Sequence, residues 1–312
     1  MPRAWDVMVD AQARGVADCA KIAFRPRCDT VTAVPGFNVC LPQPEGYQHS
    51  FCLLEFSELL TFSLQDLGYD ATFSINDVYP DRRNVLIGCH LLPTDLIAQM
   101  PESTIVVNTE QIYDEDRFGW NTNIFTWVRT FETWDYSPRN VAAFERLGLP
   151  GVKLLRIGHQ PQLTRIPKAA DQDIDVLFYG SVTDRRQVIF DEIRARGLNL
   201  VTLFGVYGAE RDAYISRSKV VLTLHNHASE IFEVVRVHYL LSNAVAVVGE
   251  VNASTAISDY YADAIAGVPY ESVAAECERL VNDAAARKAQ EERGYELIAR
   301  HPQTEFTRAV LS

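Results

Sequence analysis

Residues 219–250 read KVVLTLHNHASEIFEVVRVHYLLSNAVAVVGE. The apolar runs 219–225 and 244–250 have the length of buried strands, and the mainly apolar stretch between them has the length of a helix. Strands that alternate with helical stretches are typical of βα units that build a parallel sheet. This stretch therefore predicts an α/β fold.

The same alternation extends over most of the chain. From about residue 36 onward, FNVCLP, DATFSI, NVLIGCHLL and TIVVNTEQI are predicted strands, and residues 51–68 are a predicted amphipathic helix. In the second half, residues 173–180 and 198–205 are predicted strands, and residues 274–301 are a predicted long polar helix. We therefore predict a doubly wound fold.

Residues 159–173, HQPQLTRIPKAADQD, have the character of an interdomain linker. They are polar, contain two prolines and show no periodicity. We place a domain boundary near residue 165, with an N-terminal domain over 1–165 and a C-terminal domain over 166–300. The last helix, 301–312, is expected to cross back to the first domain.

Charge and composition restrict the partners. The 312 residues carry a formal net charge of −12, which repels phosphate backbones, and no run of Lys or Arg offsets it, so we expect no nucleic-acid partner. The six cysteines form no CxxC pair, which favours reduced thiols. With no apolar leader and no uncharged stretch of membrane-spanning length, we expect a cytoplasmic protein without a membrane span.

Two loops at predicted strand ends carry residues suited to anions. In YGSVTDRR, residues 179–186, Gly180 permits close approach of the backbone, Ser181 donates hydrogen bonds and Arg185 opens the next helix. Ligands of open α/β sheets sit at such strand ends, where helix N-termini favour anions. The loop therefore predicts a diphosphate cradle, and the alternative is an ordinary turn with solvated arginines.

Charges also gather near the start of the predicted helix in residues 229–243. With Ser229 as the N-cap, Glu230, Glu233 and Arg236 occupy one arc of this helix, and apolar residues cover much of the rest. We expect this face to border a ligand cleft. The alternative is a surface pair between Glu233 and Arg236 at i,i+3 spacing.

Candidate general bases follow strands of the first half. His90 ends VLIGCH, Glu110 ends TIVVNTE, and both lie at predicted carboxyl ends, where a base faces a cleft. Asp135 in WDYS is a third candidate. For a lone histidine such as His90, a structural role is the alternative.

Other conspicuous residues have competing interpretations. His225 and His227 stand near a glutamate, as metal ligands do, but a third ligand is not evident, so we expect a phosphate or sugar contact and no metal. The aromatic side chains of Trp120, Trp127 and Trp134 could stack on a glycan acceptor, but core packing is the favoured role.

The runs DIDVLFYGSVTDRR, LFGVYGAERDAYISRSKVVLTLH and EIFEVVRVHYLLSNAVAVVGE together resemble the nucleotide-binding domain of GT-B glycosyltransferases, particularly bacterial CgeB-like and family-4-like members. The resemblance implies two Rossmann-like domains with a cleft between them. It places a nucleotide sugar in the C-terminal domain and the acceptor at the N-terminal domain, and it requires no bound metal or other cofactor. The donor-binding residues that it implies are Gly180, Ser181, Arg185, Tyr207, His225, Glu230, Glu233 and Arg236.

The chain departs from the family-4-like pattern at Tyr239, which stands where a ribose-binding glutamate would lie, so that Glu233 or Glu250 would have to substitute for it. The two-glutamate spacing of retaining members is also absent. The resemblance therefore implies no stereochemical course for the reaction.

The predicted activity is a metal-independent transfer of a sugar from a nucleoside diphosphate sugar to the hydroxyl of a glycan or other acceptor, with Arg185 and helix amides stabilising the leaving diphosphate. Glu110 or His90 would be the catalytic base. One alternative is a non-hydrolysing nucleotide-sugar epimerase, and another is a non-catalytic module that binds a nucleotide or sugar.

Overall fold

The computed structural model describes residues 22–25, 36–112, 120–226 and 231–312. The chain divides into two compact units. The N-terminal unit comprises the described residues up to Gln160 together with Pro302–Ser312, and the C-terminal unit comprises the described residues of Pro161–His301.

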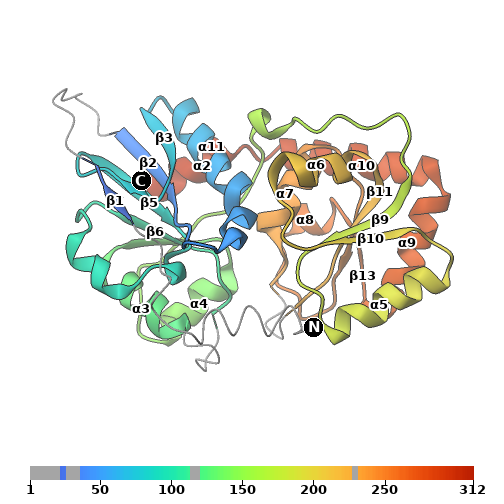
Figure 1. Cartoon of the computed structure of the whole chain (residues 1–312), viewed down its shortest axis with the longest axis horizontal. Coiled ribbons are helices and arrows are strands. Elements are labelled where there is room, and N and C mark those ends of the chain that lie inside the picture. The colour runs from blue at the N-terminus through green and yellow to red at the C-terminus, as the bar shows by residue number, and fades with distance from the viewer. Residues whose placement is uncertain (1–21, 26–35, 113–119, 227–230) are drawn as a thin grey trace. The chain divides into compact units, whose positions relative to one another are not determined.

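The N-terminal unit is built on a six-stranded parallel sheet (Figure 1). The strand order is β3-β2-β5-β6-β7-β8. These strands are β2 (Gly36–Leu41), β3 (Ala71–Ile75), β5 (Arg82–Ile87), β6 (Ile105–Asn108), β7 (Glu132–Asp135) and β8 (Lys153–Leu154). A separate short pair joins β1 (Ala23–Phe24) to β4 (Asp77–Val78).

Helices cover both faces of this sheet. On one face, α3 (Trp120–Thr130) and α4 (Pro138–Arg146) pack over a core that includes Trp127 and Phe144. On the other face lie α2 (Leu54–Asp66) and α11 (Gln303–Leu311), joined by a 2.6 Å hydrogen bond between the hydroxyls of Ser63 and Thr307. The last helix of the chain is therefore part of the N-terminal unit.

The C-terminal unit contains a five-stranded parallel sheet with the order β10-β9-β11-β12-β13. The strands are β9 (Ile174–Tyr179), β10 (Leu200–Leu203), β11 (Ser218–Thr223), β12 (Val247–Glu250) and β13 (Ala266–Val268). From β9 the chain adds β10 on one side, and it then crosses back to place β11 on the other side of β9. Such a switch point is where open α/β sheets place their ligands.

Two apolar layers enclose the second sheet, and helices cover each of them (Figure 1). One lies under α6 (Gly208–Ser216), α7 (Val234–Ser242) and α10 (Ala284–Ala299), and the other lies under α5 (Asp184–Ala195) and α9 (Val273–Asn282). Neighbouring residues of one strand, such as Val247 and Val248, enter opposite layers, because side chains alternate along a strand. The short α8 (Asp259–Ala262) packs with the first layer.

Two predicted helices differ from the observed ones. The helix predicted from Ser229 begins at Val234 instead, because Ile231 forms a β-bridge with Ala256 and Phe232 donates its backbone N–H to the Ala256 carbonyl at 3.1 Å. Ser229 and Glu230 lie outside the described residues. The predicted long helix 274–301 is two helices, because Asp283 leaves helical geometry and caps α10.

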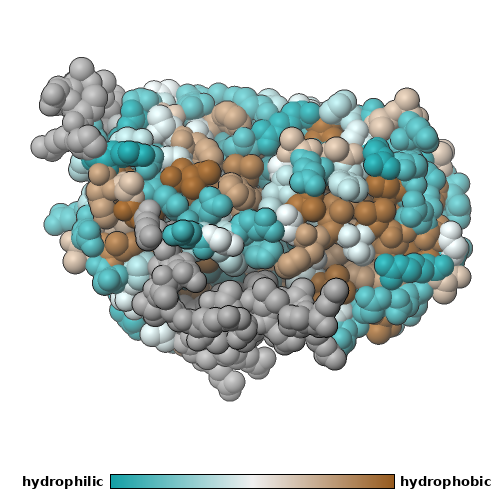
Figure 2. All heavy atoms as spheres, in the orientation of Figure 1, coloured by the Kyte–Doolittle hydropathy of each residue, from teal (hydrophilic) through white to brown (hydrophobic). Residues whose placement is uncertain are grey.

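The visible face of the molecule mixes hydrophilic residues with small apolar areas (Figure 2). Among the described residues, the large apolar side chains that are exposed include Phe24, Ile75, Val188 and Phe204. Apolar residues exposed in this way are ordinary in globular proteins. No helix within the described ranges is long and apolar enough to cross a membrane.

Candidate functional site

Three strand ends of the C-terminal unit bring charged residues together at the switch point. Gly180 follows β9, His225 follows β11 and Glu250 ends β12. Because parallel strands present their carboxyl ends at the same edge, the loops after these strands are neighbours. Helix α5 begins at this edge with Asp184, and its N-cap Thr183 accepts a hydrogen bond from the Arg186 backbone N–H at 3.4 Å.

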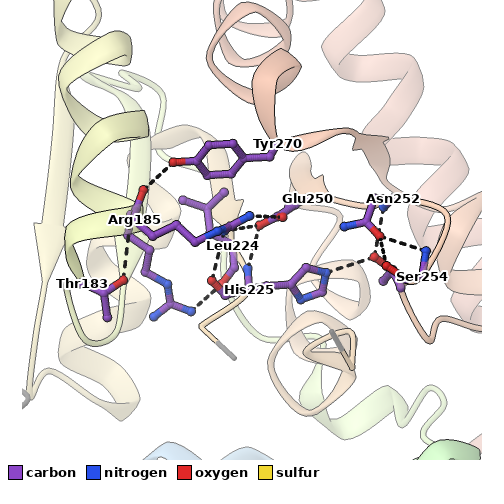
Figure 3. A network of polar contacts seen from close by, with 10 residues as sticks. Thr183, Arg185, Leu224, His225, Glu250, Asn252, Ser254 and Tyr270 are labelled. Atoms are coloured by element: carbon purple, nitrogen blue, oxygen red, sulfur yellow. Dashed lines mark hydrogen bonds and ion pairs between the residues drawn. The ribbon is translucent and has the colours of Figure 1, made fainter. Parts of the chain in front are cut away.

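Arg185 is held in place by Glu250 and Tyr270 (Figure 3). Its guanidinium donates to both carboxylate oxygens of Glu250, with one Nη1–Oε2 distance of 2.7 Å. The carboxylate of Glu250 is buried and also accepts the His225 backbone N–H at 3.1 Å. On the other side, the Arg185 guanidinium carbon lies 4.0 Å from the centre of the Tyr270 ring. A cation on an aromatic ring is electrostatically favourable.

Arg186 is the buried member of the arginine pair. Its guanidinium donates to the Ser181 carbonyl at 2.9 Å, to the Leu224 carbonyl, and to Glu233 Oε1 at 3.1 Å. Burial lowers the pKa of Arg186 to about 10, and the nearby Glu233 carboxylate opposes that shift. Arg186 therefore links the loops after β9 and β11 to the start of α7, a role that the sequence did not reveal.

Glu233 and Arg236 complete the group. Glu233 Oε2 lies 2.9 Å from Arg236 Nη1, which is the predicted i,i+3 pair, while Glu233 Oε1 contacts Arg186. The guanidinium of Arg236 stacks 4.8 Å from the centre of the Tyr179 ring. Gly180 has φ +136°, and a Cβ placed there would lie 3.2 Å from Arg236 Nη2. Glycine at this position therefore permits both the backbone conformation and the approach of Arg236.

We call Arg185, Arg186, Arg236, Glu233 and Glu250 the arginine cluster. Three guanidinium groups and two carboxylates leave one net positive charge in the cluster. The N-terminus of α5 adds the partial positive charge of its first-turn amides. Guanidinium groups and helix N-termini are the groups that proteins use to bind phosphates. The edge is chemically suited to a multiply charged anion.

Other predicted donor-binding residues lie close by in the C-terminal unit. Tyr207 is the N-cap of α6. His225 is buried, and its Nε2 lies 3.1 Å from the Thr255 hydroxyl. Glu230 and His227 lie outside the described residues, and within the described ranges no group of three side chains could hold a metal ion.

Tyr239 is buried between charged neighbours. Its hydroxyl donates to Asp212 Oδ2 at 2.6 Å and accepts from Arg165 Nε at 3.0 Å. Of the two carboxylates named as substitutes for the missing glutamate, Glu250 is enclosed by its partners, whereas Glu233 is about one-fifth exposed. Glu233 is therefore the more accessible of the two.

In the N-terminal unit, His90 and Glu110 meet at the carboxyl ends of the neighbouring strands β5 and β6. His90 Nε2 lies 3.4 Å from Glu110 Oε1. Burial lowers the pKa of His90, and the Glu110 carboxylate opposes the shift. The His90 side chain is 8% exposed and that of Glu110 is 26% exposed, so Glu110 is the member of the pair that a substrate reaches more easily.

Asp135, the third candidate base, is completely buried at the end of β7. Burial raises the pKa of its carboxyl to about 7, and three donated hydrogen bonds oppose the shift. A group without exposed surface does not contact a substrate, so Asp135 is not a base in this conformation. Trp127 and Trp134 are likewise fully buried, which confirms their predicted role in the core.

The fold of the chain resembles that of several solved structures. HepE of Anabaena, solved in complex with UDP and glucose, has a TM-score of 0.58 at 7% identity and matches 89% of this chain and 98% of that one. BGT of T4 phage, solved in complex with its UDP-glucose substrate, has a TM-score of 0.55 at 10% identity and matches 88% and 98%. The chain has the GT-B fold. A glycosyltransferase from Rickettsia africae gives a TM-score of 0.56 at 6% identity, over 90% of this chain and 97% of that one.

Comparisons of sequence leave the subfamily of this GT-B protein open. No protein-family model matches the chain. One uncharacterized protein of Acanthamoeba polyphaga mimivirus is 27% identical over 169 residues, or 51% of this chain and 53% of that protein. A second protein of the same virus is 36% identical over 67 residues, or 21% of this chain and 8% of that protein. The chain thus spans about half of the first relative, and the CgeB-like and family-4-like assignments stay predictions.

Proposed function

We propose that this GT-B protein is a glycosyltransferase that moves a sugar from a nucleoside diphosphate sugar to an acceptor hydroxyl. The observation that carries the proposal is the arginine cluster at the switch point of the second sheet. Its charge and position suit a diphosphate. The UDP and UDP-glucose complexes of HepE and BGT make a uridine nucleotide the first donor to test.

In this proposal the three arginines of the cluster have different roles. Arg186 is buried and already donates to oxygen atoms of Ser181, Leu224 and Glu233, so it organises the loops. Arg185 and Arg236 keep exposed surface and are the guanidiniums that would contact the diphosphate. As the glycosidic bond breaks, negative charge builds up on the leaving diphosphate, and positioned guanidiniums and amides stabilise it most at that point. We propose that these groups supply the positive charge without a bound metal.

Glu110 is the proposed base that accepts the proton of the acceptor hydroxyl. It is more exposed than His90 and lies at a strand end. His90 would then orient the Glu110 carboxylate through the 3.4 Å contact. The proposal names the acceptor only by its hydroxyl group, on a glycan or another molecule.

Thermal unfolding with nucleotides tests donor binding. We would compare UDP, GDP, ADP, CDP and dTDP in the presence of a chelator, with the native chain, Arg236→Ala and Arg217→Ala. Arg217 is the matched control, because it also forms an arginine–carboxylate pair, with Asp173. The pair lies at the amino ends of β9 and β11, away from the carboxyl ends that carry the arginine cluster. A ligand at one hundred times its Kd stabilises a protein by about 2.7 kcal/mol.

We expect UDP to raise the unfolding temperature of the native chain and of Arg217→Ala, and to leave Arg236→Ala unchanged. If no diphosphate shifts any of the three proteins, or if Arg236→Ala responds like the native chain, the donor site is not where we propose. Incubation with UDP-glucose then separates the activities. Released UDP supports a transferase, whereas an isomerised UDP-sugar without free UDP indicates an epimerase, and binding without turnover indicates a non-catalytic module.

A further inference from the structure

Asp135 stands at the centre of a buried hydrogen-bond network beneath Glu110. Asp135 pairs with Asn108 in the register of β7 and β6. Its Oδ2 accepts from Asn108 Nδ2 at 2.6 Å and from Asn140 Nδ2 at 3.1 Å, and its Oδ1 accepts from the Ser137 backbone N–H at 2.7 Å. All three donors are neutral groups, and all four residues are buried.

The same two asparagines hold the backbone that carries Glu110. Asn108 Nδ2 and Asn140 Nδ2 each donate to the Glu110 carbonyl at 2.8 Å. In return, Asn108 Oδ1 accepts the Glu110 N–H at 3.2 Å, and Asn140 Oδ1 accepts the Ile112 N–H at 3.0 Å. Both side-chain amides therefore bridge the Asp135 carboxylate to the segment 110–112.

A carboxylate is a costly choice for this position. Burying a charged group without an opposite charge opposes folding, even when hydrogen bonds satisfy its oxygens. The raised pKa of Asp135 reflects that cost. However, Oδ2 of this carboxyl accepts from both amides at once, which a carboxyl oxygen does in either protonation state, so it fixes the orientation of both amides with their nitrogens toward it. That orientation is the one in which the amides also reach the Glu110 carbonyl.

We propose that Asp135 is a positioning residue that acts through Asn108 and Asn140 to hold the Glu110 carboxylate at His90. The functional meaning of this network rests on the proposed role of Glu110 as the base. The geometry itself does not depend on that role, because it concerns the distance between two side chains of the same unit.

The titration of His90 reports that distance without any substrate. The Glu110 carboxylate raises the pKa of His90 against the effect of burial, so any change that moves Glu110 away should lower it. We would label the histidines isotopically, assign His90 with His90→Gln, and follow its ring signals by NMR against pH. Glu110→Gln gives the full effect of losing the carboxylate.

The variants are Asp135→Asn, Asn140→Ala and the control Asn84→Ala. Asn140→Ala removes one bridging amide but keeps the Asp135 charge, so it separates positioning from a direct effect of that charge. Asn84 is a buried amide of the same sheet that also bonds to backbone, at Tyr79 and Arg82. It reproduces the loss of buried hydrogen bonds without touching the segment 110–112.

We expect Asp135→Asn and Asn140→Ala each to lower the pKa of His90 by at least half of the shift in Glu110→Gln, and Asn84→Ala to leave it unchanged. The proposal is overturned if Asn140→Ala titrates like the native chain, or if Glu110→Gln leaves His90 unaffected. If Asp135→Asn does not fold, Asn140→Ala decides alone. Because the readout needs no nucleotide, a failed UDP test would contradict the proposed function and leave this result standing.

Discussion

Arg185 and Glu250 form a bidentate ion pair whose partners differ in exposure: the Glu250 side chain is 1% exposed, whereas that of Arg185 is 42% exposed. The pair joins the first turn of α5 to the end of β12. The exposed surface of Arg185 is therefore available to a ligand, while the buried Glu250 carboxylate fixes the position of the guanidinium. The same asymmetry predicts how the pair responds to mutation.

Arg185→Ala should destabilise the protein more than Glu250→Gln. Losing the arginine leaves the buried carboxylate without its cation and, among the described residues, with only the His225 N–H as a donor, which costs about 1–3 kcal/mol. Losing the charge of Glu250 leaves an arginine that water can solvate, at a cost of about 0.5–1.5 kcal/mol. Urea unfolding of the two variants measures the difference. Equal losses would contradict the assignment of Glu250 as the buried partner.

If the proposed donor site is correct, Gly180→Ala should weaken UDP binding as well as stability. The backbone at φ +136° is unfavourable for alanine, and the added methyl group would lie 3.2 Å from Arg236 Nη2. We expect a loss of about 1–3 kcal/mol in the free energy of unfolding and a smaller UDP-induced thermal shift.

Gly197→Ala is the matched control for Gly180→Ala. It has φ +78°, and its Cβ would meet no atom within 4 Å. The Gly197→Ala variant should lose stability only through the unfavourable backbone conformation of alanine at positive φ, and it should respond to UDP like the native chain. If Gly180→Ala kept the native UDP shift, the approach of Arg236 to residue 180 would have no part in binding.

His90 should make the protein less stable at acid pH. The pKa of His90 in the folded state is lowered from 6.5. As the pH falls below 6.5, His90 therefore binds a proton in the unfolded chain before it does so in the folded protein, which favours unfolding. The stability contributed by neutral His90 is present above pH 6.5 and is lost below it. In urea unfolding at a series of pH values, His90→Gln should therefore lose less stability than the native chain on acidification.

Asp135 should have the opposite dependence. Its pKa is raised from 3.8 to about 7 in the folded state, so its contribution to stability is complete below pH 3.8 and is lost as the pH rises to about 7. By the cost of about 1.4 kcal/mol per pKa unit, the full change is on the order of 4 kcal/mol. Relative to the native chain, Asp135→Asn should gain stability over this interval. A difference that does not vary with pH would mean that the buried carboxyl is ionised throughout.

The alternation of strands and helices was predictable from local pattern. The runs 174–180, 219–225 and 244–250 all contribute to strands of one parallel sheet, because burial on both faces demands continuous apolar runs. The start of α7 was not predictable, because Ile231 and Phe232 pair with Ala256, a residue some two dozen positions away. Helical periodicity carries no information about such a distant contact.

The candidate site was predictable only in part. The sequence pointed to the loops after β9 and β11 and to Glu233, Arg236, His90 and Glu110, all of which lie at strand ends or helix starts. It favoured Arg185 over its neighbour Arg186 as the ligand-binding group, but it gave no sign that Arg186 organises the site. Helix geometry alone indicates that Arg185 and Arg186, as adjacent residues of a first turn, face different directions and cannot have the same role, but it does not say which of them is buried.

The class of fold and the loops that carry the candidate residues follow from the chain alone, because apolar period, segment length and the order of elements are local properties of the sequence. The burial of Arg186, the ion pair of Glu250 with Arg185, and the hydrogen bonds of the buried Asp135 to Asn108 and Asn140 became visible only in the three-dimensional structure. Each of these outcomes depends on which strand ends become neighbours. Whether a charged side chain is buried in the structure or exposed to a ligand depends on the residues that surround it in the folded chain.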